Sequence, residues 1–576
     1  LENDRYKVTI DRNGDVCSVY DKRAGRELLR EAARWELCYE HPLRFPSWNM
    51  EWADRQLPVK EYVSGPARIR IVENGPVRVA IEVERTLRGN MFRQVISLAA
   101  GEPGNTVRYD NTVKWQMRGR SLRASFPLTV SAPKATYNWE SATVQRDNNR
   151  SHKFESPSHE WFDLTDRSGS YGVSVLEDCK NGSDKPNDST LRLTLLYTPH
   201  ANREYYGVWQ DWGEHAFSYA LYGHEGSWQK AGSNRRGRFF NEPLLTFLPR
   251  EKHAGPLGRS VSAASVDKSN VKMLAMKRAE HADGYYIVRF NEHYGNTLTD
   301  DVQARFCRKI ADAYETDGQE RRTGPADFTP DGLRFTMGRY GIRTFAVRFE
   351  APETVPSVRC TPVELPFDTD AVSLNTDRSD GEMAQGSSFA GELFPETLTV
   401  DDIVFRLGDT APGARNAVSL RGQRITLPAG DYDRLYLLMS ADRDTKGVKI
   451  KVDGRSFPID VQSWQGYIGQ WERRLTDNTL SDVLYGIETG YIKRDPVALL
   501  GTHRHTPEGD LSYRYSYIYK YSIPVSGAST LELPSAPGVK LFAVTAAGGT
   551  NDRVVPAMDL YDNFDDREPF ELLYPT

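Results

Sequence analysis

Apolar and polar residues alternate with a period of two along much of the chain. The pattern is clearest in residues 67–72 (Ala-Arg-Ile-Arg-Ile-Val), 77–84 and 191–196. Successive side chains of a strand point to opposite faces, so this alternation predicts strands with one buried face. Gly, Pro, Asn and Asp between the runs favour turns. We therefore expect antiparallel sheets over most of the chain.

Helical periodicity is scarce. The best local candidate is residues 23–35, which predict a helix of about three turns. Residues 302–317 fit either a helix or two strands, and we expect two strands because their neighbours are strands and the Gly318 region supplies a turn. A (β/α)₈ barrel or a doubly wound sheet needs helices between its strands, and the sequence lacks them. The predicted fold class is all-β.

The chain is too long for one hydrophobic core, because 576 residues normally divide into two to four domains. Residues 250–269 are polar and carry Gly, Pro and Ser, and residues 351–366 contain four prolines. Both segments are typical of linkers. We therefore predict three units, at residues 1–262, 263–350 and 351–576.

Composition and charge exclude several classes of function. The formal net charge is −5 and the basic residues are scattered, which gives no basis for nucleic-acid or anionic-membrane binding. No apolar run reaches the length of a membrane helix. Five dispersed cysteines form no metal-binding spacing, and motifs for nucleophiles or phosphate binding are absent. The chain begins without Met or a signal peptide, so we expect it to be part of a longer polypeptide.

Residues 211–228 are the densest in chemistry. They hold two His, two Glu, one Asp and five aromatic residues, and they closely follow Tyr205, Tyr206 and Trp209. We expect a strand at 216–222 flanked by glycine-containing loops. Polar groups and aromatic faces at strand ends suit a sugar-binding surface, although a core strand with a solvated end has the same composition. The candidate contacts to a ligand or a neighbouring domain are Glu214, His215, His224, Glu225, Trp212 and Trp228.

Two further groups are candidate metal ligands. Residues 368–380 offer only oxygen donors, which suits a structural calcium ion better than zinc, with a solvated turn as the alternative. The four carboxylates there are Asp368, Asp370, Asp377 and Asp380. His503 and His505 share one face of an extended segment, and with Asp510 they form an alternative zinc site; a solvent-facing loop is the other interpretation.

An ordered series of motifs resembles the region that follows the catalytic domain in glycoside hydrolase family 38, the α-mannosidases. Residues 211–228, for example, resemble the family pattern D-x-G-x-H-x-F-x-Y-A-L-x-P-H-x-G-x-W, although Gly223 stands where the family has Pro. Residues 365–505 are similar to an extra sandwich appended in bacterial members. The other stretches of the series are 6–29, 109–127, 172–180, 239–243 and 342–345.

The resemblance implies a large mutarotase-like supersandwich followed by smaller antiparallel β-sandwich domains. It also implies an N-terminal catalytic barrel and a helical bundle as partners within the same enzyme. The family's barrel carries an Asp nucleophile, an acid/base carboxylate and a zinc ion for retaining hydrolysis of α-mannosides. No barrel is predicted in this chain, so we expect a non-catalytic portion that packs on the barrel and shapes its substrate cleft.

Two other functions fit the same residues. One is a free-standing carbohydrate-binding protein that uses the sandwich surface. The other is a mutarotase-like sugar isomerase, in which His215 or His224 would exchange protons with Glu214 or Glu225. An open, concave sheet face lined by these groups would favour the isomerase.

Overall fold

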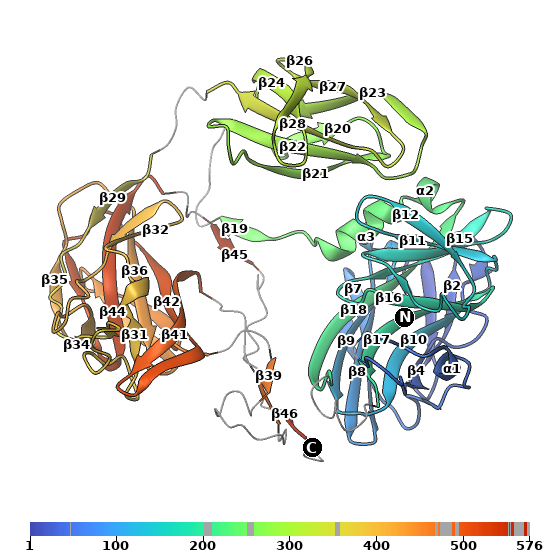
Figure 1. The fold of residues 1–576 in the computed structure, drawn as a ribbon, viewed down its shortest axis with the longest axis horizontal. Coiled ribbons are helices and arrows are strands. Elements are labelled where there is room, and N and C mark those ends of the chain that lie inside the picture. The colour runs from blue at the N-terminus through green and yellow to red at the C-terminus, as the bar shows by residue number, and fades with distance from the viewer. Residues whose placement is uncertain are drawn as a thin grey trace.

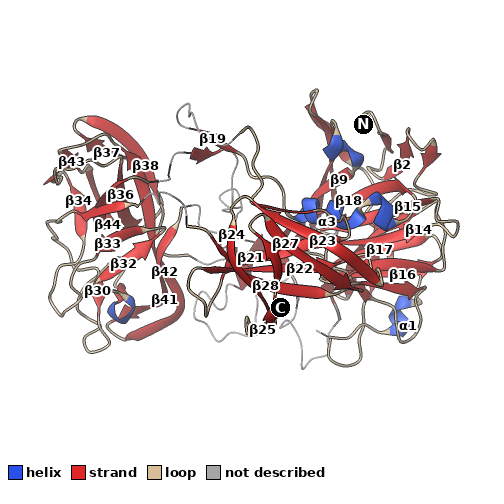
Figure 2. Cartoon of the chain, turned by 90° about the horizontal axis from the view of Figure 1, so that it is seen from above, coloured by secondary structure: helices blue, strands red, loops and turns tan. Residues whose placement is uncertain are grey.

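The structure is a computed structural model that describes residues 1–46, 48–200, 210–249, 258–351, 357–466, 470–472, 486–489, 495–550, 552, 554–557 and 570–572. Strands dominate these residues (Figure 2), which confirms the all-β prediction. Figure 1 shows three separate bodies of strands, coloured blue to green, lime, and yellow to red along the chain. No helix among the described residues is long and apolar enough to span a membrane.

The first body is a large sandwich of two main sheets. A small third sheet is formed by β1 (Tyr6–Ile10), β2 (Val16–Asp21) and β3 (Arg26–Glu27). The nine-stranded sheet contains, in spatial order, β12 (Thr143–Asp147), β11 (Lys134–Asn138), β14 (Trp161–Thr165), β15 (Tyr171–Glu177), β18 (Gly213–Glu225), β9 (Val107–Trp115), β8 (Asn90–Ala99), β7 (Arg78–Leu87) and β6 (Arg68–Asn74). The six-stranded sheet contains β13 (Ser156–Pro157), β16 (Gly182–Asn187), β17 (Thr190–Thr198), β10 (Arg120–Pro127), β4 (Arg34–Tyr39) and β5 (Glu61–Tyr62).

Side-chain alternation explains how these sheets pack. In β9 every second residue from Val107 to Trp115 is buried, and the residues between them are half-buried. The buried side chains meet those of the six-stranded sheet, where Trp35 packs edge-on against Phe92 with ring centroids 5.9 Å apart. Trp35 Nε1 donates to the Tyr219 hydroxyl at 2.9 Å. The core therefore lies between the two sheets, and β18 crosses it near the middle of the larger sheet.

The predicted helix at residues 23–35 is wrong. This stretch forms β3, a turn and the start of β4. The Glu27 carboxylate accepts hydrogen bonds from the backbone N–H groups of Val19, Leu28 and Leu29, which takes up donors that a helix would need. Both leucines are buried. The prediction of two strands at residues 302–317 is confirmed by β23 (Leu298–Phe306) and β24 (Ile310–Thr316).

Two short helices and a small sandwich follow the first body. The helices α2 (Trp228–Ala231) and α3 (Ser233–Asn241) lie after β18, and α1 (Trp52–Arg55) lies in the first body. The sandwich has its own core and contacts the first body through Trp228 and Tyr294, whose ring centroids are 5.6 Å apart. Its four-stranded sheet contains β20 (Ala264–Val266), β23, β27 (Gly332–Gly338) and β26 (Asp327–Thr329). Its five-stranded sheet contains β21 (Val271–Arg278), β22 (Tyr285–Glu292), β28 (Ile342–Phe349), β24 and β25 (Arg322–Pro325).

The third body is built on an eight-stranded sheet that is covered on both faces. Every residue of β36 is buried, because separate hydrophobic clusters lie on the two sides of the sheet. The sheet contains β29 (Arg359–Pro362), β44 (Ser535–Gly548), β36 (Arg434–Ala441), β42 (Gly509–Pro524), β41 (Val497–Thr506), β31 (Ser388–Ala390) and β30 (Val372–Ser373), with β34 (Val418–Arg421) paired to β44.

Smaller sheets complete this part of the chain. Four strands, β35 (Arg424–Thr426), β43 (Thr530–Glu532), β37 (Thr445–Val452) and β38 (Arg455–Val461), form one sheet, and β32 (Thr397–Val400) pairs with β33 (Ile403–Arg406). Separate ladders join β19 (Phe247–Pro249) to β45 (Val554–Pro556), and β39 (Gln470–Glu472) to β40 (Gly486–Thr489) and β46 (Phe570–Glu571). Both predicted unit boundaries fall near residues outside the described ranges, so their positions stay predictions.

The outer face of the six-stranded sheet carries buried charges, which we name the charged layer. Arg123, whose side chain is fully buried, donates to Glu155 Oε2 at 3.1 Å and lies 3.5 Å from Asp184. Burial alone would raise the pKa of Asp184, but Arg192 and Arg123 hold that pKa well below its usual range. The members of the charged layer are Glu36, Glu40, Arg55, Arg123, Glu155, Asp184 and Arg192.

We expect Arg123→Ala to lower the free energy of unfolding of the first body by roughly 3–5 kcal/mol, because the carboxylates of Asp184 and Glu155 each lose one charged partner. Nine of the 11 Trp lie in residues 1–228, so urea unfolding followed by Trp fluorescence reports mainly on this body. Arg167→Ala is the control, since that exposed pair with Asp188 contributes at most about 1 kcal/mol. Equal losses in the two variants would contradict a structural role for the charged layer.

Candidate functional site

The structure divides the cluster predicted at residues 211–228 between two ends of one strand. β18 runs from Gly213 to Glu225, which is longer than the predicted strand, and Gly223 lies within it. His215 and His224 are nine residues apart, or roughly 30 Å along an extended strand. Glu214 and His215 therefore cannot share a site with His224 and Glu225. Tyr205, Tyr206 and Trp209 lie outside the described residues.

His224 is part of a closed group of polar side chains inside the first body. Its side chain is 2% exposed, and Nε2 lies 2.7 Å from Asp163 Oδ2. Asp163 also accepts hydrogen bonds from Thr165 Oγ1 and Ser174 Oγ. A Cβ on Gly172 would lie 2.5 Å from His224 Cε1, so the neighbouring strand has no room for a larger residue. These contacts give His224 a structural role.

The other candidates on this strand are placed differently. Trp212 is buried and its Nε1 donates to the Met117 carbonyl at 2.9 Å. Trp228 is buried against Trp161, with ring centroids 4.9 Å apart. Neither indole face is open for stacking on a sugar. At the opposite end, His215 Nε2 lies 2.9 Å from the Asp211 carbonyl.

We expect His224→Ala to destabilise the first body by roughly 3 kcal/mol, because the buried Asp163 carboxylate loses one of its partners and the His224 ring leaves a cavity. Glu225→Ala, at the exposed end of the same strand, should change stability by about 0.5 kcal/mol or less. Thermal and urea unfolding of both variants provide the measurement. A loss at Glu225 as large as that at His224 would show that position on the strand, and not the buried pair, determines the effect.

The four carboxylates of residues 368–380 accept hydrogen bonds from four different donors. Asp368 accepts from the Ser419 N–H, Asp370 from the Val372 N–H, Asp377 from Ser379 and Asp380 from the Gly413 N–H. In the part of the chain that the structure describes, the oxygens of these four side chains do not form a cluster that could hold one metal ion. The four carboxylates are close in the sequence, but each one accepts hydrogen bonds from a different set of partners, some of them in distant segments.

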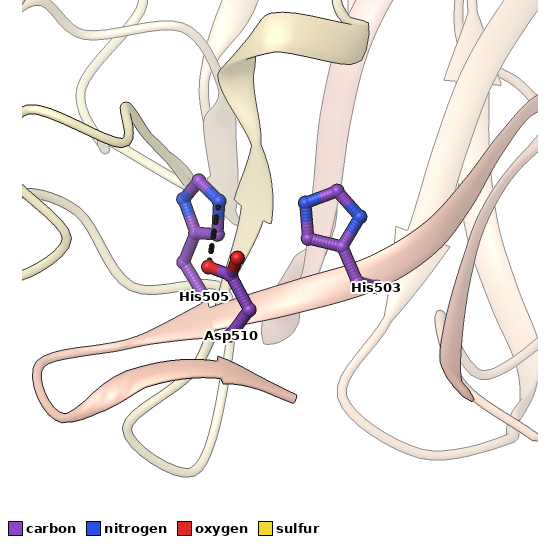
Figure 3. A group of neighbouring side chains, drawn as sticks. All are labelled: His503, His505 and Asp510. Atoms are coloured by element: carbon purple, nitrogen blue, oxygen red, sulfur yellow. Dashed lines mark ion pairs between the residues drawn. The ribbon is translucent and has the colours of Figure 1, made fainter. Parts of the chain in front are cut away.

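His503, His505 and Asp510 are brought together, as one of the sequence hypotheses expected. One ligand atom from each lies within 4.8 Å of the others. The reason is local: β41 and β42 form a hairpin whose register places His505 directly opposite Asp510, and His503 lies two residues away on the same face. Figure 3 shows the three side chains rising from the same side of this hairpin. This is the group of described residues best suited to hold a metal ion.

A large groove in the third body was missed by the sequence analysis. It has a volume of about 1040 Å³ and is lined by acidic side chains together with Lys520, Tyr436 and Tyr521. Its aspartates come from segments far apart in the chain; only Asp401 and Asp402 are adjacent, and no local pattern could have revealed them. The lining aspartates are Asp401, Asp402, Asp460, Asp495 and Asp552.

Comparisons with known families match two parts of the chain. The model described as "Glycosyl hydrolases family 38 C-terminal domain" matches residues 1–203. The model described as "AziU2-like beta-sandwich domain" matches residues 359–550, which contain most of the third body.

Known proteins similar to this chain include α-mannosidases. "Alpha-mannosidase 2C1" of Mus musculus is 28% identical over 376 residues, and that of Homo sapiens is 30% identical over 375 residues. Each alignment covers 61% of this chain and 34% of the relative, so the chain spans about a third of these curated relatives. A solved glycosyl hydrolase family 38 protein from Enterococcus faecalis has a TM-score of 0.47 and 18% identity, covering 61% of this chain and 44% of that chain. Together these matches support a C-terminal region of glycosyl hydrolase family 38 at residues 1–203.

Proposed function

We propose that this chain is the non-catalytic β-sandwich portion of an α-mannosidase, which packs on the enzyme's catalytic barrel and helical bundle and shapes the substrate cleft. The observation that carries the proposal is the family 38 match over residues 1–203, supported by relatives that are α-mannosidases and about three times as long as the aligned region. The substrate of the whole enzyme would be an α-mannoside or a glycan that contains one. The isomerase alternative gains no support, because β18 separates the two His–Glu pairs.

The chemical step of this proposal belongs to residues outside the chain. In the family that the sequence resembles, an Asp nucleophile, an acid/base carboxylate and a zinc ion in the barrel carry out retaining hydrolysis. The role of residues 1–576 would be to support the barrel and to place loops at the mouth of its cleft. Such a permanent contact requires an apolar surface that stays exposed until the catalytic domain covers it.

Residues 41–57 offer such a surface, which we name the aromatic segment. Trp48 is 82% exposed, and its ring stacks on the half-exposed Phe45 with centroids 5.4 Å apart. The segment is nevertheless held in place: the Tyr197 hydroxyl donates to the Asn49 carbonyl at 2.6 Å, and Arg55 pairs with Glu40 of the charged layer. Exposed aromatic side chains on an anchored loop are typical of interface hot spots. We assign the catalytic domain as the partner of the aromatic segment.

Purified residues 1–576 should not hydrolyse a chromogenic aryl α-mannoside, either after dialysis or after addition of zinc. Turnover should appear when the catalytic domain of the same enzyme is added, because that domain would supply both carboxylates and the zinc site. Steady-state release of the aryl group is the measurement. Turnover by residues 1–576 alone would place the catalytic carboxylates in this chain and overturn the proposal.

Trp48→Ala should weaken association with that catalytic domain at least about tenfold, as expected for an aromatic hot spot. Its melting temperature should stay close to that of the wild type, because the side chain is mostly exposed. Tyr513→Ala, a comparably exposed aromatic residue in the third body, is the matched control and should leave association unchanged. Calorimetric titration measures both variants. Unchanged binding by Trp48→Ala would exclude the aromatic segment from the interface.

A further inference from the structure

We propose that His503, His505, Asp510 and Glu392 form a binding site for a divalent transition-metal ion, zinc being the best fit, at the edge of the eight-stranded sheet in the third body. The site is independent of the proposed α-mannosidase function. Two imidazole nitrogens and two carboxylate oxygens are a donor set that suits a tetrahedral zinc ion.

The first argument is a buried nitrogen without a hydrogen-bond partner. The His505 side chain is fully buried, and its Nε2 makes no hydrogen bond within the described part of the chain. Its Nδ1 lies 3.2 Å from the Ser373 carbonyl, which can only accept, and on this contact we assign the proton to Nδ1. Nε2 is therefore left with a lone pair. A buried acceptor without a partner is costly, and a metal ion would satisfy it.

The surroundings of His505 also fit a metal ligand. Metal-bound histidines usually donate their second ring nitrogen to a carbonyl or carboxylate, as His505 does to Ser373. The Ser373 hydroxyl lies 3.0 Å from the same nitrogen and 2.6 Å from Ser388 Oγ. These contacts fix the orientation of the ring, and Nε2 points toward the carboxylates.

The second argument is the spacing of the donor atoms. His505 Nε2 lies 3.5 Å from Asp510 Oδ1, which is too long for a good hydrogen bond. Two ligands of one tetrahedral zinc ion lie about 3.3 Å apart, given bond lengths of about 2.0–2.1 Å. Glu392 Oε2 lies 3.9 Å from the same nitrogen, and its other oxygen accepts from the Asn375 N–H at 2.6 Å. The separations therefore match shared coordination more closely than direct hydrogen bonding.

His503 supplies the remaining nitrogen. Its ring centroid lies 5.4 Å from that of His505, and it is half-buried. His503 Nδ1 lies 3.2 Å from the Thr502 hydroxyl. One of its ring nitrogens lies within 4.8 Å of the ligand atoms of His505 and Asp510, so the ring would have to rotate to reach bonding distance. The site thus has two ligands on β41, one directly opposite on β42 and one from a separate loop.

Arg378 competes with the ion for Asp510. Its Nε donates to Asp510 Oδ1 at 2.7 Å, and its Nη1 donates to the Asn375 carbonyl at 3.0 Å. Binding of a cation would shift the Asp510 carboxylate toward His505 and weaken its contact with Arg378. Removal of the Arg378 guanidinium should therefore strengthen metal binding.

The test uses purified residues 1–576, freed of metal with a chelator and then dialysed. Titration with Zn²⁺ by calorimetry should give one bound ion per chain, and Co²⁺ should develop visible absorption bands of a tetrahedral complex. His503→Ala should lower the Zn²⁺ affinity at least about tenfold, and Glu392→Gln should also lower it. His281→Ala, which removes an exposed histidine of the second body, is the matched control and should bind as the wild type does.

Two further measurements separate a specific site from weak surface binding. Zn²⁺ should raise the melting temperature of the wild type but not that of His503→Ala, because only specific binding to the folded state stabilises it. Arg378→Gln should bind Zn²⁺ more tightly than the wild type. Equal stoichiometry and affinity in the wild type and His503→Ala, or no binding of either ion to the wild type, would overturn the proposal.

Discussion

The first body depends on the pairing of opposite charges in the charged layer, on the outer face of the six-stranded sheet. One face of this sheet supplies the apolar core, and the other carries the buried side chains of Arg123 and Arg192. Buried guanidinium groups are tolerable only when carboxylates lie beside them, so strands β4, β10, β16 and β17 must keep their register. Because Arg55 and Glu40 belong to the same layer, this register also fixes the start and end of the aromatic segment.

The fold was predictable where one face of a strand is apolar. The alternation at residues 67–72, 77–84 and 191–196 predicted β6, β7 and β17, although Ile69 and Ile71 of β6 are exposed. The pattern failed at residues 23–35, where the adjacent leucines Leu28 and Leu29 are buried next to a turn. There the deciding interaction is the Glu27 carboxylate, which binds three backbone N–H groups. A single side chain that captures backbone donors leaves no periodic signal in the sequence.

Only the part of the candidate metal site that lies on one hairpin could be predicted from the sequence. His503, His505 and Asp510 lie within eight residues and meet because a tight β41–β42 turn sets their register. Ser373 and Glu392, which complete their surroundings, come from more than 100 residues away. The aspartates of residues 368–380 are also close in the sequence, but their oxygens do not meet at one point in space. Asp163 beside His224 likewise depends on the pairing of distant strands.

The short antiparallel ladder between β19 and β45 gives the chain the topology of a ring. It joins segments about 300 residues apart, and the second and third bodies both lie between them. The entropy lost in closing so long a loop grows only with the logarithm of its length, so a few strand contacts suffice to hold it. As a result the third body is joined to the rest of the chain at two points, once through the backbone between β28 and β29 and once through the ladder.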